Sequence, residues 1–399
     1  MNKFNNIFGQ ILEIFSRTDF WGFVKETKSA VGTKGFSCWT QFVCMMFCQL
    51  GRANSLREIC YGLASSFGKI RHLGINRAPS RSTLSYANEH RPWQLYEKLF
   101  YNFLERCRGA LGPQHKFRFK NKLLSFDASL IELCIEIFDW AKYRRTKGAV
   151  KLHLLLDHAG YLPQFVHITE GKTHEVNVLK KLDFDTGTIV AMDKGLNDYV
   201  MYGEWTRKGI YFVTRLKKNA DYDVIEERRI PQNRSILKDQ IIRLRGFYSK
   251  EKCPYDLRLV EVWVEEKQDS IVLLTNQLSF GATTIAAIYR DRWQIELFFK
   301  ALKQNLRIKT FVGTSRNAVM IQIWTALIAI LVLKYLKAKS KIGWSLSNLV
   351  AMLRFNLLTY RDLWEWINNP YFSPPQVPQS EQLNFSFQFS WTAKGVTWF

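Results

Sequence analysis

Apolar residues in the first 75 positions recur at helical spacing. Residues 42–50 are apolar on almost every side, which predicts a buried helix. The segment ANSLREICYGL (53–63) predicts a second helix, with Asn54 or Ser55 as its N-cap. We therefore predict a helical N-terminal domain over residues 1–75, with DNA binding as one possible role.

A basic, Ser-rich segment, NRAPSRSTLSYANEHRPW (76–93), follows this domain. Pro79 and Ser80 suit a helix start, and Arg81 would lie in the first turn. Two interpretations stay open: a helix that reads DNA, and an ordinary capped linker helix. We assign residues 76–117 to a helical connector.

The hydrophobic period changes near residue 118. A short apolar run, 122–130, ends in Asp127, and residues 149–169 predict a β-hairpin. Further along the chain, patterns predict helices over 173–182 and 198–209 and strands over 187–195 and 210–216. This alternation predicts an α/β fold, a mixed sheet flanked by helices.

Residues 217–275 alternate basic and β-rich segments, which predicts an antiparallel insertion. A long helix is expected from Thr283 to about Lys309, before a buried helix over 321–333 that is too short to cross a bilayer. We assign residues 118–335 to the catalytic domain and 336–399 to a helical C-terminal region with a loose, Pro-rich tail after Pro370.

Charge points to a polyanionic partner. The chain of 399 residues has 57 Lys plus Arg against 35 Asp plus Glu, a formal net charge of +22. Such an excess favours nucleic acid, because cationic side chains that meet phosphates release counterions; a basic protein from a basic proteome is the alternative.

Several classes of function lack their motifs. The seven Cys show no CxxC spacing, and the sequence has no Walker A loop and no Gly-rich dinucleotide loop. We therefore exclude a zinc hydrolase and ATP- or NAD-dependent chemistry. The first residues resemble no signal peptide, so we expect a cytoplasmic, nucleoid-associated bacterial protein with no membrane partner.

Three acidic residues are candidates for chemistry. Asp127 and Asp193 each end a buried strand, where carboxylates point into the crevice of an α/β sheet. Either residue alone could be a turn or cap residue. The third acid, Glu296, lies on the long helix.

The long helix has an apolar stripe and, on another side, a polar stripe that we expect to face outward. The polar stripe contains Tyr289, Arg292, Trp293, Glu296, Lys300 and Lys303. An ordinary salt-bridge face, with Arg292–Glu296 and Glu296–Lys300 pairs, is the alternative. The salt-bridge alternative leaves Tyr289 and Trp293 unexplained. In two-metal phosphodiester cleavage, the acids would bind the metals and the cationic side chains would contact phosphates.

The residues Tyr289, Arg292, Glu296 and Lys303 have the spacing Y-x2-R-x3-E-x6-K, which resembles the signature of the IS4 family of DDE transposases. FDAS (126–129) and MDKGLNDY (192–199) are similar to the motifs of the family's two aspartates. Ala128 is a departure, since many members have Ser, Gly or Thr after the first Asp.

The resemblance implies an RNase H-like core with a β-rich insertion before the last catalytic helix. It implies an enzyme that binds terminal inverted repeats and moves an insertion sequence by cut-and-paste, using Mg²⁺, or Mn²⁺, as cofactor. Asp127, Asp193 and Glu296 would be the metal ligands. The resemblance further implies that Tyr289, Arg292 and Lys303 contact phosphates and that Trp293 stacks near a flipped base. Lys300, which flanks them on the polar stripe, is a further candidate for DNA binding. A homodimer in a synaptic complex is also implied.

Two other functions stay open. A repurposed copy could bind specific DNA without cutting it, although the intact acids argue against this. A related nuclease could hydrolyse DNA without joining the ends.

Overall fold

The computed structural model describes residues 5–371, except for 32, 34, 67, 113–115, 135, 137, 145–146, 233–234 and 309. The predicted loose tail falls almost wholly outside the described residues, since only Tyr371 of it is included.

Helices form the N-terminal part of the chain, as the sequence predicts. Ser55 rather than Asn54 caps its helix, because its side chain accepts from the backbone N–H of Glu58. Ser80 caps the next helix in the same way, through Thr83. The elements here are α1 (Ile7–Glu13), α2 (Arg17–Glu26), α3 (Cys38–Leu50), α4 (Leu56–Ala64), the 3-10 helix η1 (Lys69–Leu73), α5 (Arg81–His90) and α6 (Gln94–Leu111).

Helix α12 (Arg316–Lys339) crosses the interior of the helical part and packs on α6, α3 and α5. Every residue from Ala318 to Leu333 is buried. By length and composition this helix could cross a membrane, but 89% of its most apolar stretch is already covered by protein. The prediction of a buried helix is therefore confirmed, and the helix extends beyond the predicted 321–333 at both ends.

One apolar core joins the helical part to the sheet. It includes Phe42 of α3, Phe100 of α6, Leu327 of α12 and Leu154 of the sheet. The chain then ends in helices α13 (Leu346–Asn356) and α14 (Leu363–Asn368). Because the core is shared, the domain boundaries at 75, 117 and 335 stay a prediction.

A ten-stranded mixed sheet forms the rest of the molecule. The central neighbours β1, β5 and β6 are parallel, and the pairs outside them are antiparallel. The predicted hairpin is present as β3 and β4. In spatial order the strands are β2 (Lys142–Arg144), β3 (Lys147–Asp157), β1 (Leu123–Leu133), β5 (Ile189–Met192), β6 (Tyr211–Arg215), β10 (Asp269–Thr275), β9 (Leu257–Val264), β8 (Ile236–Leu244) and β7 (Tyr222–Glu227), with β4 (Leu162–Glu170) on β3.

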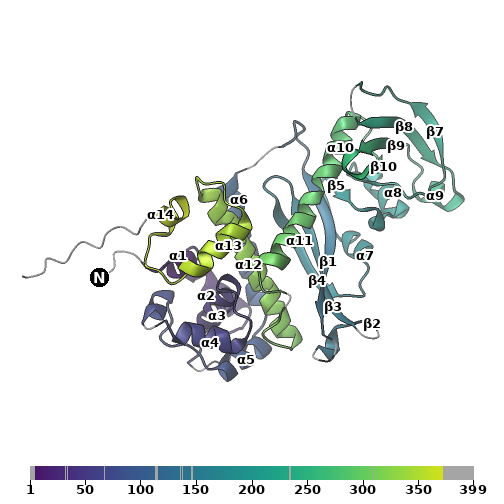
Figure 1. Ribbon diagram of the computed structural model, residues 1–399. Coiled ribbons are helices and arrows are strands. Elements are labelled where there is room, and N and C mark those ends of the chain that lie inside the picture. Colours follow the sequence, from purple (N-terminus) through teal and green to yellow (C-terminus); the bar gives the residue numbers. More distant parts are fainter. Residues whose placement is uncertain are drawn as a thin grey trace, which may run out of the picture.

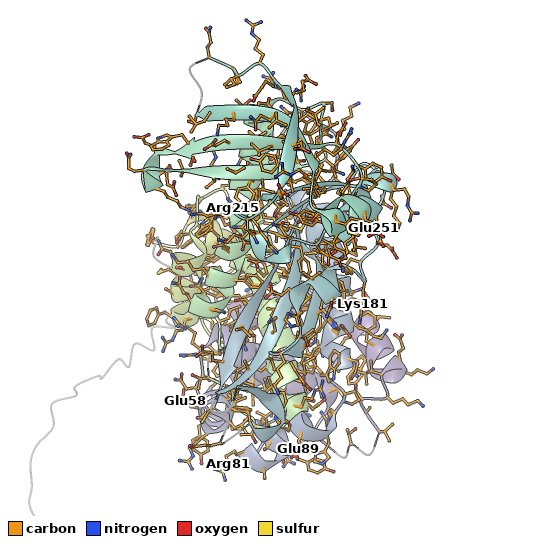
Figure 2. All side chains as sticks on the ribbon, turned by 90° about the vertical axis from the view of Figure 1, so that its right-hand side faces the viewer. Glu58, Arg81, Glu89, Lys181, Arg215 and Glu251 are labelled. Atoms are coloured by element: carbon orange, nitrogen blue, oxygen red, sulfur yellow. The ribbon has the colours of Figure 1, made fainter. Side chains whose placement is uncertain are left out.

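Helices α7 (Glu175–Leu179) and α8 (Tyr199–Arg207) follow β4 and β5 as predicted. The predicted antiparallel insertion is also present, as β7–β10 with α9 (Phe247–Lys252). It continues the main sheet, because β10 pairs with β6. In Figure 1 it lies at one end of the sheet, and Figure 2 shows Arg215, the last residue of β6, at the junction.

Helices α10 (Ala282–Asp291) and α11 (Trp293–Asn305) follow one another alongside the sheet, from the insertion toward α12 (Figure 1). Side chains of a strand alternate between its two faces. Leu123 of β1 and Ala191 of β5 pack with Ile288 of α10, whereas Leu124 and its neighbours on the other face pack with α8. Helix α10 therefore covers the face of odd-numbered residues on β1 and β5.

Candidate active site

Asp127 lies in the middle of β1. The sequence predicted that the strand ends at Asp127, and this is wrong: β1 continues to Leu133 because its pairing with β3 extends to Gly148. The neighbour on the other side, β5, does stop here, since its last partner pair is Phe126 with Met192. Asp127 thus lies where the parallel pairing ends and the sheet opens.

Asp193 follows the last residue of β5, as predicted. Its carboxylate accepts, at 3.5 Å, from the backbone N–H of Gly195 in the short helix η3 (Lys194–Leu196). By the alternation of strand side chains, Asp127 and Asp193 continue the series that faces α10 and α11. The two aspartates therefore come from adjacent parallel strands onto the same face of the sheet.

The predicted long helix is two helices. It breaks at Arg292, between α10 and α11. Past the break, the N–H of Ile295 bonds to the carbonyl of Arg292, which tightens the first turn of α11. The apolar side of α11, which includes Phe298 and Leu302, packs into the core shared with α12.

The polar stripe of these helices does not face solvent throughout, so that expectation is wrong in part. Tyr289 is 9% exposed and Arg292 only 7%. Tyr289 packs among the apolar side chains between α10 and the sheet, with the Arg292 guanidinium 5.4 Å from its ring centre. The stripe turns inward here because α10 covers the sheet beside the two aspartates.

Glu296 forms an ion pair with Arg292, at 2.8 Å between Oε1 and Nη2. Its side chain is one-third exposed, whereas that of Arg292 is nearly covered. The pair is the first of the two that an ordinary salt-bridge face would give. The Nε of Arg292 is nevertheless buried without a partner, so the guanidinium keeps one donor unsatisfied.

Asp127 has an unusual electrostatic environment. Its pKa is raised from 3.8 to about 6. Burial is the main cause; the N–H of Ala128 and the Arg292 guanidinium lower the pKa, and the carboxylates of Glu175 and Glu296 raise it. Burial raises the pKa of Tyr289, and Asp193 acts on it in the same direction. Acids from β1, α7 and α11 therefore lie near one another, and Asp193 lies near Tyr289.

The donor set suits a hard divalent cation. Carboxylate oxygens are the ligands that Mg²⁺ prefers, and a cation would stabilise the ionised form of Asp127, which burial and, to a smaller degree, Glu175 and Glu296 disfavour. In the described part of the chain, however, no three acidic, His or Cys side chains lie close enough to form a ready-made metal cluster. Glu296 is instead held by Arg292, so metal binding would require this side chain to turn.

The remaining predicted site residues lie along α11. Trp293 is 54% exposed, and Lys300 is exposed as well, so both can reach a ligand outside the protein. The ammonium group of Lys303 donates to the carbonyl of Leu130 on β1 at 2.8 Å, which joins α11 to the strand of Asp127.

Two acidic residues near the site escaped the sequence reasoning. Glu175, the first residue of α7, is close enough to influence Asp127 and pairs with Lys151 at 3.3 Å. It stands in the sequence GKTHE (171–175), where no spacing pattern singles it out. Asp291, the last residue of α10, has a completely buried carboxylate that contacts His158, and no sequence pattern marked it.

Comparison with known families settles the class of protein. A family model described as "Transposase DDE domain" matches residues 118–332, more than half of the chain. The chain belongs to the DDE transposases. A second model, a domain of unknown function (DUF4372), matches residues 3–76 of this transposase.

Curated relatives agree. The transposase is 30% identical to the putative transposase y4zB of Sinorhizobium fredii, over 72% of this chain and 78% of the relative. It is 26% identical to a probable transposase for the insertion sequence element IS5377 of Geobacillus stearothermophilus, over 69% and 72%. A putative transposase for the element IS4SA of Synechocystis is 31% identical over 27% of this chain and 36% of its own. The resemblance to the IS4 family is thereby confirmed.

Among solved structures, the transposase is similar to the piggyBac transposase in its synaptic complex with hairpin DNA, with a TM-score of 0.41 and 11% identity over 94% of this chain and 86% of that one. The family and the mixed sheet establish an RNase H-like α/β fold. The protein is thus an insertion-sequence transposase, an enzyme that binds, cleaves and joins DNA with divalent metal ions.

Proposed function

We propose that Asp127, Asp193 and Glu296 hold a pair of Mg²⁺ ions, or Mn²⁺, during DNA cleavage and strand transfer. The observation that supports this most is that Asp127 and Asp193 lie on one face of two adjacent parallel strands, with Glu296 of α11 close enough to act on Asp127. When bound, such ions activate the attacking oxygen and stabilise the leaving one. Glu175 is a further carboxylate within electrostatic range.

Arg292 is proposed to exchange partners when DNA binds. It holds Glu296 in the free protein and keeps its Nε unsatisfied. A phosphate oxygen beside the site would satisfy that donor, and Glu296 would then be free to turn toward the aspartates. Tyr289, stacked under the guanidinium, would hold Arg292 in place during the exchange.

The other DNA contacts are assigned by exposure. Lys300 would contact phosphate from the outer side of α11, and Trp293 would stack on a base displaced from the duplex. Lys303 would hold the scissile phosphate from its place beside Leu130.

The helical part is proposed to recognise the transposon ends. Residues 1–75 and the connector 76–117 present Arg57 and Arg81 together in a pocket with accessible volume of about 350 Å³ beside Phe311. Figure 2 shows Arg81 at the opposite end of the molecule from the insertion. DNA that contacts both the active site and this pocket would therefore extend along the protein. Two such protomers would form the synaptic homodimer that brings both ends together.

The test uses the full-length protein with Mg²⁺ and DNA that flanks its own gene, where the terminal repeats should lie. We expect the wild type to cleave this DNA and to join the ends to a target. Glu296→Gln should lose cleavage and keep DNA binding. Binding without cleavage by the wild type would instead identify a repurposed DNA-binding protein, and nicking without joining would identify a nuclease.

A further inference from the structure

A chain of buried polar side chains links the sheet to the junction of α10 and α11. The Oγ of Ser125 lies 2.7 Å from the Nε2 of His158, whose Nδ1 lies 2.6 Å from the Oδ2 of Asp291. The hydroxyl of Tyr161 donates to the same carboxylate at 3.2 Å, and Lys116 forms an ion pair with it. Ser125, His158 and Asp291 are all 5% exposed or less.

The roles of the donors follow from the carboxylate. Burial alone would raise the pKa of Asp291, but hydrogen bonds and charge from His158 and Lys116 bring it below its ordinary value. Asp291 is therefore ionised and accepts hydrogen bonds. The Nδ1 of His158 must then be the donor in its bond to Asp291.

The order Ser–His–Asp is that of a hydrolase triad, but hydrolysis is excluded here. A nucleophile must reach its substrate. Ser125 is 0% exposed, and its hydroxyl is turned into the interface between β1 and α10. The cluster therefore has to act within the protein.

The positions of Ser125, His158 and Asp291 in the sequence show which segments this cluster connects. Ser125 precedes Asp127 by two residues and lies on the same face of β1. Asp291 is the last residue of α10, next to Arg292, where the helix breaks, and five residues before Glu296. His158 also donates its backbone N–H to the carbonyl of Leu123 on β1, at 3.1 Å.

We propose that Asp291 and His158 are positioning residues that fix the α10–α11 junction against β1 and thereby set the distance between Glu296 and Asp127. This inference rests on the proposed metal site and adds the residues that hold its ligands at a fixed distance from one another. An apolar contact would allow the helix junction to slide over the strand, whereas short hydrogen bonds to a buried carboxylate fix one register.

The predicted consequence is a loss of metal affinity. Partners that orient metal-binding carboxylates change affinity by about 10–100-fold when they are removed. Asp291→Asn should therefore bind Mn²⁺ about 10–100-fold more weakly than the wild type. Saturating Mn²⁺ should restore cleavage to within a few fold, and DNA binding should stay unchanged.

The experiment titrates full-length protein with Mn²⁺ and follows the free ion by electron paramagnetic resonance. Asp239→Asn is the matched control. Asp239 is also buried and is held by Arg258 through two 2.8 Å hydrogen bonds, in the insertion. This control should lose thermal stability to a similar extent and bind Mn²⁺ like the wild type.

A second pair of variants separates positioning from folding. In His158→Asn the amide nitrogen takes the place of Nδ1 and keeps the bond to Asp291, whereas His158→Leu removes it. We expect weakened Mn²⁺ binding in the Leu variant and substantial recovery in the Asn variant. If Asp291→Asn does not fold, Tyr161→Phe removes one bond to the carboxylate and should still weaken Mn²⁺ binding several fold.

The outcomes distinguish this inference from the proposed function. Glu296→Gln must weaken Mn²⁺ binding if Glu296 is a ligand at all; no effect there overturns the metal site itself. If Glu296→Gln weakens binding while Asp291→Asn, or the folded Tyr161→Phe, matches the Asp239→Asn control, the metal site stands and the positioning role is wrong.

Discussion

Two buried helical regions of this transposase are built in opposite ways. Helix α12 is buried from Ala318 to Leu333 by side chains that are almost all apolar. At the junction of α10 and α11, by contrast, the charged residues Asp291 and Arg292 are buried, and Arg292 is close enough to act on Asp127. Apolar burial stabilises a fold, whereas buried charges need partners and often add little stability. Helix α12 therefore serves the fold, whereas the junction is the region to which we assign the chemistry.

Glu296→Gln should have the largest effect on cleavage, with little effect on stability. Loss of a catalytic group lowers the rate of cleavage by about a thousandfold or more. Stability should change by less than about 1 kcal/mol, because Glu296 is partly exposed and its pair with Arg292 is weak. Cleavage assays and urea unfolding on the same preparation measure both effects. A large loss of stability would instead make Glu296 a structural residue.

Leu327→Ala tests the apolar side. Leu327 is 0% exposed in the middle of α12, so the cavity left by the substitution should lower the free energy of unfolding by about 2–5 kcal/mol. Cleavage per folded molecule at low temperature should match the wild type. A normal urea midpoint would show that α12 is not the core helix described above.

Asp127→Asn should raise stability while abolishing cleavage. The pKa of Asp127 is about 6 in the folded protein against an ordinary 3.8, so the folded state retains a proton that the unfolded chain releases. Ionisation therefore destabilises the metal-free protein as pH rises through about 6. One pH unit of pKa difference corresponds to about 1.4 kcal/mol, so the variant should gain about 1–3 kcal/mol at pH 7.5.

This gain should shrink as pH falls through about 6 and vanish near pH 4. Urea unfolding in EDTA between pH 5 and 8 measures it. A difference that is independent of pH would contradict the raised pKa of Asp127.

Lys300→Ala is expected to have the smallest effect. An exposed lysine that contacts one phosphate contributes about 0.9 to the slope of log affinity against log salt. In this variant the salt dependence of the affinity for the transposon end should be weaker by that amount, and the stability of the protein should not change. Lys303→Ala is the companion variant: it should lower the slope similarly and also lower the melting temperature, because Lys303 bonds to Leu130. Unchanged slopes in both variants would remove α11 from the DNA interface.

Much of the fold could be predicted from local pattern. The hairpin of β3 and β4 and the helix α8 have strong periods and clear turn residues; Gly209, at a φ of +68°, follows α8 as expected. The acids Asp127, Asp193 and Glu296 became candidates because the ends of apolar runs and a spaced signature mark them in the sequence, and their role as a site stays a prediction.

What escaped prediction depends on contacts between distant segments. β1 passes Asp127 because β3 continues to pair with it, and no local pattern shows a partner's length. The helix breaks at Arg292 without Pro or Gly, next to Asp291 and its buried contact with His158, a partner that no local pattern reveals. Ser125 and His158 look like ordinary strand and turn residues until the fold brings them together.

The most direct test of a catalytic junction is a crystal of the transposase soaked in Mn²⁺ and measured at the manganese absorption edge. We predict anomalous density between Asp127 and Asp193, with Glu296 turned away from Arg292 toward the ion. Manganese elsewhere, or an empty site with Glu296 still paired to Arg292 at saturating Mn²⁺, would contradict the account.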